Sequence, residues 1–150
     1  MRYWFDTEFM EDGRIVAPLS IGIVSEDGRE YYCEFDTNRG MANEWVRKNV
    51  FPFLTGPIKR SREIREDILS FVTGEPEFWA YYAAYDWVIM CQLFGTMMRL
   101  PESWPKYCLD IKQVMHMKGI RSVQRPEGGD HNALADARWN RRIWKEIIAA

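Results

Sequence analysis

The chain has 150 residues, a length that fits one hydrophobic core and leaves little room for two. Hydrophobic residues make up 47% and charged residues 28%, which is typical of globular domains and excludes disordered, collagen-like and low-complexity chains. Twenty Lys and Arg residues against 22 Asp and Glu residues give a net charge of -2, so the protein does not coat nucleic acid through bulk positive charge. We expect a single domain over residues 1–150.

Cysteine usage and hydropathy indicate the compartment. Cys33, Cys91 and Cys108 lie far apart and without metal-binding spacing, so we expect reduced thiols rather than disulfides or a zinc knuckle. The sequence contains no apolar run of about 18 residues, as a membrane span requires. Asp6 and Glu8 interrupt the N-terminal segment, where a signal peptide needs hydrophobic residues. These features predict a cytoplasmic protein that does not enter a membrane.

The first third of the chain predicts three antiparallel strands. Aromatic residues fill RYWFDTEFM, Ile and Val dominate the stretch from Ile15 to Val24, and YYCEFD follows the turn EDGRE. Helical spacing then begins at Asn43 and stops before Pro52, and the segment SREIREDILSFV predicts a second, amphipathic helix.

The rest of the chain alternates strand and helix. EFWAYYAAY predicts a buried strand that leads directly into the apolar helix DWVIMCQLF, and KYCLDI predicts a short strand followed by a helix to Met117. After the loop SVQRPEGGD, a last helix is expected from about Asn132 to Ile148. Parallel strands need crossover helices, so this order predicts an α/β fold. It is the order of the ribonuclease H-like fold: a mixed five-stranded sheet, a three-strand meander followed by parallel strands, flanked by helices.

Two acidic residues share one face of the first strand. Alternate strand residues point the same way, so the carboxylates of Asp6 and Glu8 are neighbours. Their mutual repulsion requires a cation nearby. The alternative is a solvated strand end, which the flanking aromatic residues disfavour.

Two further acids occupy positions where a carboxylate needs an explanation. Asp86 comes where a strand passes into a helix, at the carboxyl edge of the sheet, where an N-cap is the alternative role. Asp136, Asn140, Ile143 and Ile147 follow one stripe of the last helix, so Asp136 faces the core. A buried ionised acid must be paired with a cation, protonated or bound to metal, and an Arg partner is the structural alternative.

His131 lies five residues before Asp136, about 140° around an ideal helix. Both side chains can face one site if His131 lies in the segment entering the helix, which the preceding Gly128 and Gly129 favour. The alternative is an incidental surface or capping histidine.

Together, DTEF at residues 6–9, YAAYD at residues 82–86 and HNALAD at residues 131–136 resemble the ordered motifs of the DEDDh 3′-5′ exonucleases. Within that superfamily, DTEFMEDG, YYAAYDW, CLDIK and HNALADARWN look most similar to the RNase T-like exoribonucleases, which include the bacterial polyadenylate-specific enzymes. One departure is visible. Many members carry an Asn several residues before the second-motif Asp, whereas aromatic and alanine residues occupy 81–85 here.

The resemblance implies a metal-dependent 3′-5′ exoribonuclease that hydrolyses single-stranded RNA from its 3′ end to nucleoside monophosphates, with adenylate-rich RNA as a candidate preference. Asp6, Glu8, Asp86 and Asp136 would hold two Mg²⁺ or Mn²⁺ ions about 4 Å apart, and carboxylate oxygens suit such hard ions. His131, in its neutral form, would deprotonate the attacking water. Phe9 and Met10 would contact the terminal nucleotide.

The family resemblance also implies a homodimer, which the 22 aromatic residues make plausible through an exposed apolar face. Cations for the phosphates are expected among Lys59, Arg60, Arg62 and Arg65, or at Arg121 and Arg125, with a solvated helix face as the alternative for each cluster. Two other functions compete with the exoribonuclease. One is a 3′-5′ DNA exonuclease of the proofreading type, and the other is a non-cleaving nucleic-acid-binding module on the same fold.

Overall fold

A mixed sheet of six strands, in the order β4-β3-β2-β1-β5-β6, forms the centre of the computed structural model, which describes residues 1–125 and 131–149. Its three long strands are an antiparallel meander: β1 (Arg2–Glu11), β2 (Val16–Ser25) and β3 (Glu30–Phe35). The predicted N-terminal meander is therefore confirmed.

Three short strands complete the sheet: β4 (Ile58–Lys59), β5 (Glu77–Ala80) and β6 (Leu109–Asp110). β4 runs parallel to β3, β5 parallel to β1, and β6 parallel to β5. The predicted mixed α/β sheet is confirmed, with one correction to the number of strands, six instead of five. The additional strand, β4, has two residues, too few for a strand-like alternation to show in the sequence.

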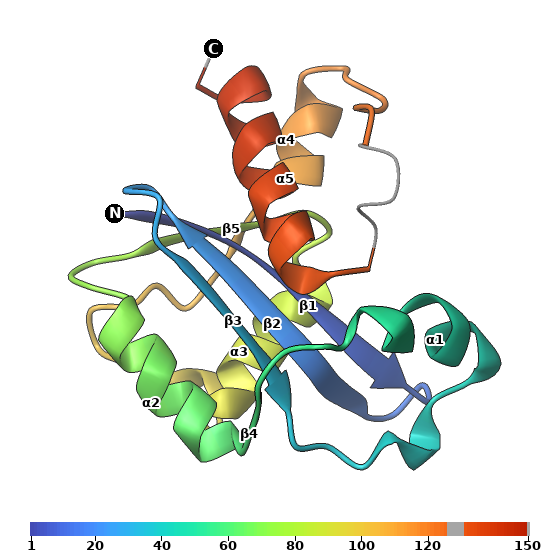
Figure 1. The fold of residues 1–150 in the computed structure, drawn as a ribbon. Helices are drawn as coiled ribbons and strands as arrows, with labels where there is room; N and C mark the ends of the chain where they lie inside the picture. Colours follow the sequence, from blue (N-terminus) through green and yellow to red (C-terminus); the bar gives the residue numbers. More distant parts are fainter. Residues whose placement is uncertain (126–130, 150) are drawn as a thin grey trace.

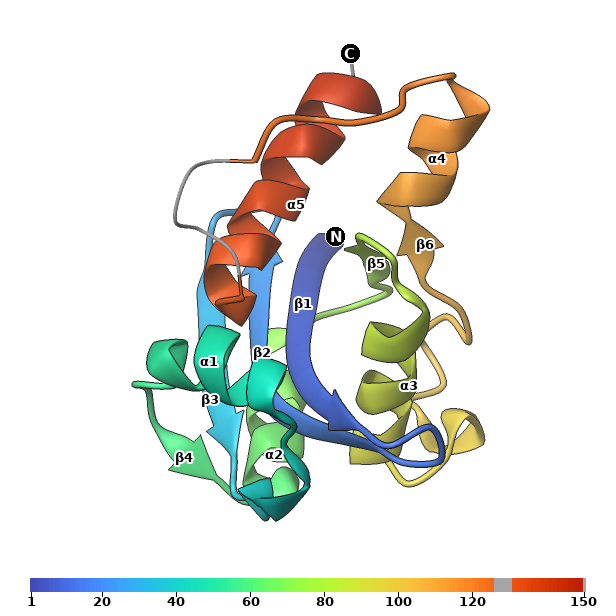
Figure 2. The ribbon, with the colours of Figure 1, turned by 90° about the vertical axis from the view of Figure 1, so that its right-hand side faces the viewer.

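Helices cover both faces of the sheet (Figures 1 and 2). The helices are α1 (Glu44–Asn49), α2 (Ser61–Phe71), α3 (Ala84–Leu93), α4 (Ile111–Met117) and α5 (Ala133–Ile147). Short 3₁₀ turns occupy Arg39–Met41, Phe51–Phe53 and Met97–Arg99. In Figure 1, α5 crosses one face of the sheet beside α4, and α2 and α3 lie on the opposite face.

The alternation of β1 supplies both halves of the core. Phe5 belongs to the cluster shared with α2 and α3, whereas Trp4 belongs to the cluster shared with α4 and α5. On α5, the predicted inward stripe is confirmed, because Asp136, Asn140 and Ile143 are all buried. The Asn140 side-chain amide donates to the Phe5 carbonyl oxygen at 3.0 Å, which ties α5 to β1 next to the acidic pair.

The strand predicted over residues 77–85 is too long. β5 ends at Ala80 and α3 begins at Ala84, so a turn separates them, with Tyr82 at φ 56°. A continuous apolar run does not distinguish a strand from a turn and a buried helix, which explains the error. Part of the predicted loop, residues 126–130 with Gly128 and Gly129, lies outside the described residues.

Two predictions about the whole chain can be compared with the structure. Cys33, Cys91 and Cys108 are free thiols, as expected. Among the described residues, no helix combines the length and the apolar character needed to cross a membrane.

Candidate active site

The acidic pair of β1 lies beside the end of a shorter strand. β5 pairs with β1 from Arg2 to Trp4 and ends at Ala80, so β1 continues past it. On the edge of β1 where β5 pairs, the backbone beyond Trp4 therefore faces the turn after β5 and the helix α3. Asp6 and Glu8 lie on this continuing part of the strand.

A glycine lets the last helix reach the acidic pair. Gly22 of β2 is the register partner of Asp6. A Cβ atom at Gly22 would lie 2.4 Å from the Leu134 nitrogen and 2.5 Å from the Ala133 carbonyl group, so the first turn of α5 rests directly on β2. This contact brings Asp136 to the sheet. Gly22 was not singled out in the sequence, although glycine inside a strand is a signal of close backbone approach.

Three carboxylates converge as a result. One oxygen each of Asp6, Glu8 and Asp136 lies within 4.8 Å of the others. The Asp136 side chain is 6% exposed. Oxygen donors in this arrangement are what hard divalent cations such as Mg²⁺ and Mn²⁺ require, so the residues present fit such an ion.

Asp86 joins the site from the first turn of α3. Its carboxylate, 5% exposed, accepts hydrogen bonds from the Thr7 backbone N–H at 2.9 Å and from the Thr7 hydroxyl. The N-cap of α3 is Ala83, so the alternative role of Asp86 as a cap is wrong. Thr7 was not singled out in the sequence, where only its place between two acids marks it.

His131 precedes the N-cap residue of α5, Asn132, in the entry segment where it was expected. Its backbone is left-handed, with φ 67°, and its N–H donates to Asp136 Oδ2 at 3.1 Å. The imidazole ring meets the Trp45 ring of α1 edge to face, with 4.8 Å between centroids. Nothing in the sequence pattern connected Trp45 with this histidine.

The predicted catalytic side chains line one cavity of about 260 Å³. Its lining consists of Asp6, Thr7, Glu8, Phe9, Tyr81, Tyr82, Tyr85, Asp86, Arg125, His131 and Asp136. The structure thus brings together the four acids and the histidine from β1, α3 and the start of α5.

Burial and mutual repulsion raise the proton affinity of the acids. Burial raises the pKa of Asp6 well above its usual value, and the charges of Asp86, Glu8 and Asp136 raise it further. Burial also raises the pKa of Asp86 to about 7, although its hydrogen bonds from Thr7 act in the opposite direction. A cation bound among these acids would offset their mutual repulsion and favour their ionised forms.

One protein cation already contacts the acids. Arg125 Nη1 lies 2.8 Å from Asp136 Oδ1, and its charge lowers the pKa of Asp6. The guanidinium group also lies over the Trp139 ring, 4.3 Å from its centroid. The arginine partner considered for Asp136 is therefore present, together with the carboxylate cluster rather than instead of it.

The two residues predicted to touch the terminal nucleotide are placed differently. Phe9 lines the cavity and packs edge to face against Tyr85, with 5.4 Å between centroids. Met10 is 1% exposed and packs with Leu19 and Val46 in a core cluster. The Met10 side chain is thus enclosed in the core whereas Phe9 lies at the cavity, and the contact of these two residues with the terminal nucleotide stays a prediction.

Comparison with known proteins identifies the family. Residues 1–148 match the family model described as the 3′-5′ exoribonuclease Rv2179c-like domain. The chain belongs to this family. It is 43% identical over 160 residues to the 3′-5′ exoribonuclease Rv2179c of Mycobacterium tuberculosis strain H37Rv, covering 99% of this chain and 94% of that protein. The same figures apply to 3′-5′ exoribonuclease MT2234.1 of strain CDC 1551.

A solved structure shares the fold. A moderately thermophilic exonuclease I from Methylocaldum szegediense superposes with a TM-score of 0.70 and 14% identity. The match covers 99% of this chain and 41% of that longer one, and at this identity it supports the fold alone. Membership of the Rv2179c-like family confirms both the predicted 3′-5′ exonuclease resemblance and the prediction of an enzyme of the exoribonuclease class.

Proposed function

We propose that this Rv2179c-like protein removes nucleoside monophosphates from the 3′ end of single-stranded RNA with the help of two divalent metal ions. The observation that carries the proposal is the convergence of Asp6, Glu8, Asp86, Asp136 and His131 on one cavity. The family match supports the 3′-to-5′ direction of degradation and RNA as the substrate. Adenylate-rich RNA is the candidate preference.

The acids would hold the metal ions and the histidine would move the proton. Asp6, Glu8 and Asp136 offer the converging oxygens, and Asp86 adds a carboxylate oriented by Thr7. When bound, Mg²⁺ or Mn²⁺ supplies charge neutralisation at the scissile phosphate and lowers the pKa of the attacking water. The neutral imidazole of His131 accepts a proton from that water. The water oxygen forms a bond to phosphorus as the bond between phosphorus and the 3′ oxygen of the preceding nucleotide breaks, and that 3′ oxygen takes up a proton. A nucleoside 5′-monophosphate leaves, and the remaining strand ends in a 3′ hydroxyl.

His131 is supported for this role by how it is held. Its backbone N–H donates to Asp136, which leaves both ring nitrogens outside that contact. The edge-to-face contact with Trp45 restrains the ring at the cavity. A general base needs such restraint because proton transfer depends on hydrogen-bond reach.

The remaining expectations accompany this proposal. We treat residues 1–150 as a single exonuclease domain, consistent with a family match that spans residues 1–148. A homodimer and a cytoplasmic location stay predictions.

A labelled-strand assay tests the proposal. The protein is incubated with Mn²⁺ and 5′-labelled RNA and DNA oligomers of the same sequence, next to the variants Asp6→Ala, His131→Ala and Asp136→Asn. We expect a ladder that shortens from the 3′ end on RNA and is lost in all three variants. Glu66→Gln, which alters an exposed ion pair on α2, serves as the matched control and should keep full activity.

Each competing function predicts another outcome. Shortening of DNA at an equal or higher rate would favour the proofreading-type DNA exonuclease. Binding without shortening would favour a non-cleaving module. Homopolymer strands of A, U and C at equal length test the adenylate preference, and equal rates on all three would contradict it.

A further inference from the structure

Backbone strain is concentrated at the candidate active site. Among the described residues, the non-glycine residues with positive φ are Tyr82 and His131, and both line the cavity of the carboxylates. Side chains with a Cβ atom rarely adopt this conformation, and tyrosine gains nothing locally from it. Such strain persists mostly at functional sites. The contact of His131 with Asp136 accounts for one of the two residues.

Core packing does not account for the other. Tyr82 is 64% exposed, so its strained backbone is not offset by burial of the ring. The ring meets Tyr81 edge to face, with 4.8 Å between centroids. Tyr81 in turn packs against Trp139 of α5 at 5.0 Å. The Tyr82 ring is therefore held by a row of aromatic rings while most of its surface stays open.

The turn that carries Tyr82 is anchored from a neighbouring strand. Asp110, at the end of β6, accepts a hydrogen bond from the Ala83 backbone N–H at 3.0 Å. The same carboxylate caps α4 by accepting from the Lys112 backbone N–H at 2.7 Å. This anchoring fixes the backbone directly after Tyr82. A pre-oriented aromatic surface loses little conformational entropy when a ligand stacks on it.

We propose that Tyr82 is a substrate-binding residue whose ring stacks on the base of the last or the second-last nucleotide of the bound strand. The inference rests on the proposed function, because the acids in the same cavity would hold the phosphate next to that base. Aromatic rings stack on any base through its π-face, so this contact adds affinity with little base preference. An Asn at this position would adopt the left-handed backbone more easily but would offer no ring.

The test compares three variants of the full chain. Tyr82→Phe keeps the ring, and Tyr82→Asn removes it while suiting the backbone. Tyr107→Asn is the matched control, since Tyr107 is equally exposed but lines a different cavity. All are made in the His131→Ala background to prevent hydrolysis, and the fluorescence anisotropy of 5′-labelled RNA with Mn²⁺ gives the dissociation constant. Each titration is repeated with an abasic site at the first, second or fifth nucleotide from the 3′ end.

We expect Tyr82→Asn to weaken binding about 5- to 150-fold, whereas Tyr82→Phe and Tyr107→Asn bind like the parent. An abasic site at the first or the second nucleotide should abolish the difference between Tyr82→Asn and its parent, and an abasic site at the fifth should leave it unchanged. In the otherwise native chain, Tyr82→Asn should raise KM, and relief of strain should raise its Tm by about 2 to 4 °C.

Equal affinities for Tyr82→Asn and its parent would overturn the inference, as would a loss that persists with abasic sites at both terminal positions. Neither result depends on cleavage. If the chain shortens RNA but Tyr82→Asn binds normally, only the stacking role fails. If the chain does not shorten RNA at all, the proposed function fails, and the binding cycle still decides the role of Tyr82.

Discussion

Thr7 of β1 helps to orient the carboxylate of Asp86. Thr7 donates to it twice, through the backbone N–H and through the side-chain hydroxyl. The hydroxyl is the part that mutation can remove. Residues that orient a ligand group often matter for a metal site almost as much as the ligand itself.

Thr7→Val should therefore weaken the metal site without disrupting the strand. Valine has the same shape, so β1 keeps its packing, but Asp86 loses one hydrogen bond at a buried position. We expect the free energy of unfolding to fall by about 1 kcal/mol and Mn²⁺ affinity to fall about tenfold. Chemical denaturation and calorimetric Mn²⁺ titration measure the two effects.

Thr7→Ser is the matched control for this prediction, because it keeps the hydroxyl and loses only a methyl group. It should bind Mn²⁺ like the wild type. Equal affinities for Thr7→Val and Thr7→Ser would show that the hydroxyl does not orient Asp86.

At the scale of elements, the site depends on how closely α5 approaches β2. The backbone of Ala133 and Leu134 occupies the place of a side chain at Gly22. Backbone atoms do not rotate aside as a flexible side chain would. An added methyl group must therefore push the first turn of α5, and Asp136 with it, away from Asp6.

We predict that Gly22→Ala destabilises the protein by about 1 to 3 kcal/mol and lowers activity more than the loss of stability explains. Thermal unfolding measures the loss of stability. Single-turnover rates, at a temperature where the variant is fully folded, measure the loss of activity separately. Gly74→Ala is the control for lost stability: its positive φ strains an alanine, but no neighbour lies within 4 Å of an added Cβ, so this variant should lose stability and keep its activity when folded. An equal loss of activity in the two folded variants would show that crowding at α5 is not what Gly22 prevents.

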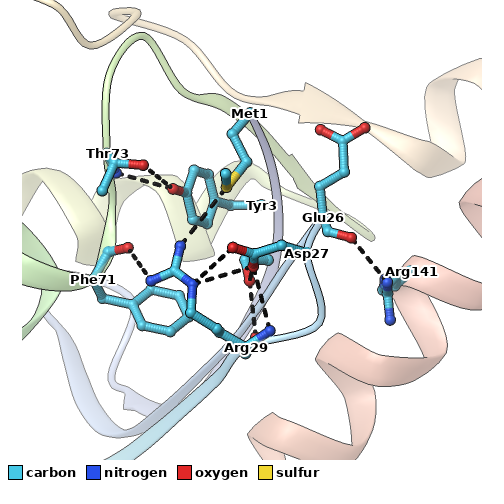
Figure 3. Close-up of polar contacts among 9 residues, drawn as sticks. Met1, Tyr3, Glu26, Asp27, Arg29, Phe71, Thr73 and Arg141 are labelled. Carbon is cyan, nitrogen blue, oxygen red and sulfur yellow. Dashed lines mark hydrogen bonds and ion pairs between the residues drawn. The ribbon is translucent and has the colours of Figure 1, made fainter.

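A second group of contacts joins the β2–β3 turn to the end of α2, as Figure 3 shows. Arg29 donates to Asp27 Oδ2 at 2.9 Å and to the Phe71 carbonyl oxygen at 3.0 Å. Nearby, the Thr73 backbone N–H donates to the Tyr3 hydroxyl at 2.9 Å. The turn thus ties the meander to the helix that covers its far face.

Because of these contacts, the free energy of unfolding should change with pH in the acidic range. Hydrogen bonds from Ser25 and Arg29 lower the pKa of Asp27 from 3.8 to about 2. Because the pKa in the folded protein is the lower one, the carboxylate stabilises the fold above about pH 4, and this contribution disappears as the pH falls toward 2.

Asp27→Asn should therefore have a lower Tm than the wild type at pH 7, and the gap should close between about pH 4 and pH 2. Thermal melts followed by circular dichroism across this range measure it, with the exposed residue change Glu102→Gln as a control that shows no such convergence. A gap of constant size down to pH 2 would contradict the assigned role of the ionised carboxylate.

At the scale of the whole molecule, the sequence was most informative about the order of strands, helices and motifs along the chain. It was least informative about close contacts between these elements. The alternation of β1 placed Asp6 with Glu8, and the helical period of the last segment placed Asp136 inward, because both patterns reflect burial directly. The ordered motifs therefore predicted which side chains gather in one cavity, and the fold class followed from the order of strands and helices.

Features that depend on distance between elements were not predictable in the same way. The turn at Tyr82 lies inside a continuous apolar run, where the spacing of apolar residues does not show where the strand ends and the helix begins. The contact of Arg125 with Asp136 and that of Trp45 with His131 join segments that no local pattern relates. The close approach at Gly22 left only a weak signal, a glycine within a strand.

Charge links the site to the stability of the whole molecule. The chain carries a net charge of only -2, yet four of its acids line one cavity with a single arginine paired to Asp136 among the contacts described. Arg125 offsets part of this charge and also competes with any metal ion for Asp136. A ligand that binds only the folded state at 100 times its dissociation constant stabilises that state by about 2.7 kcal/mol.

We therefore predict that Mn²⁺, at 100 times its dissociation constant, raises the Tm of the wild type by about 5 to 11 °C. In EDTA, Arg125→Gln should melt at a lower temperature than the wild type, because the acids lose a positive neighbour. Its Tm should rise more on addition of Mn²⁺, because the competing cation is gone. Scanning calorimetry with and without Mn²⁺ at constant ionic strength measures both gains. Arg62→Gln, which breaks an exposed pair with Glu66, should leave both unchanged. An equal Mn²⁺ gain in Arg125→Gln and the wild type would show that Arg125 and the metal do not share Asp136.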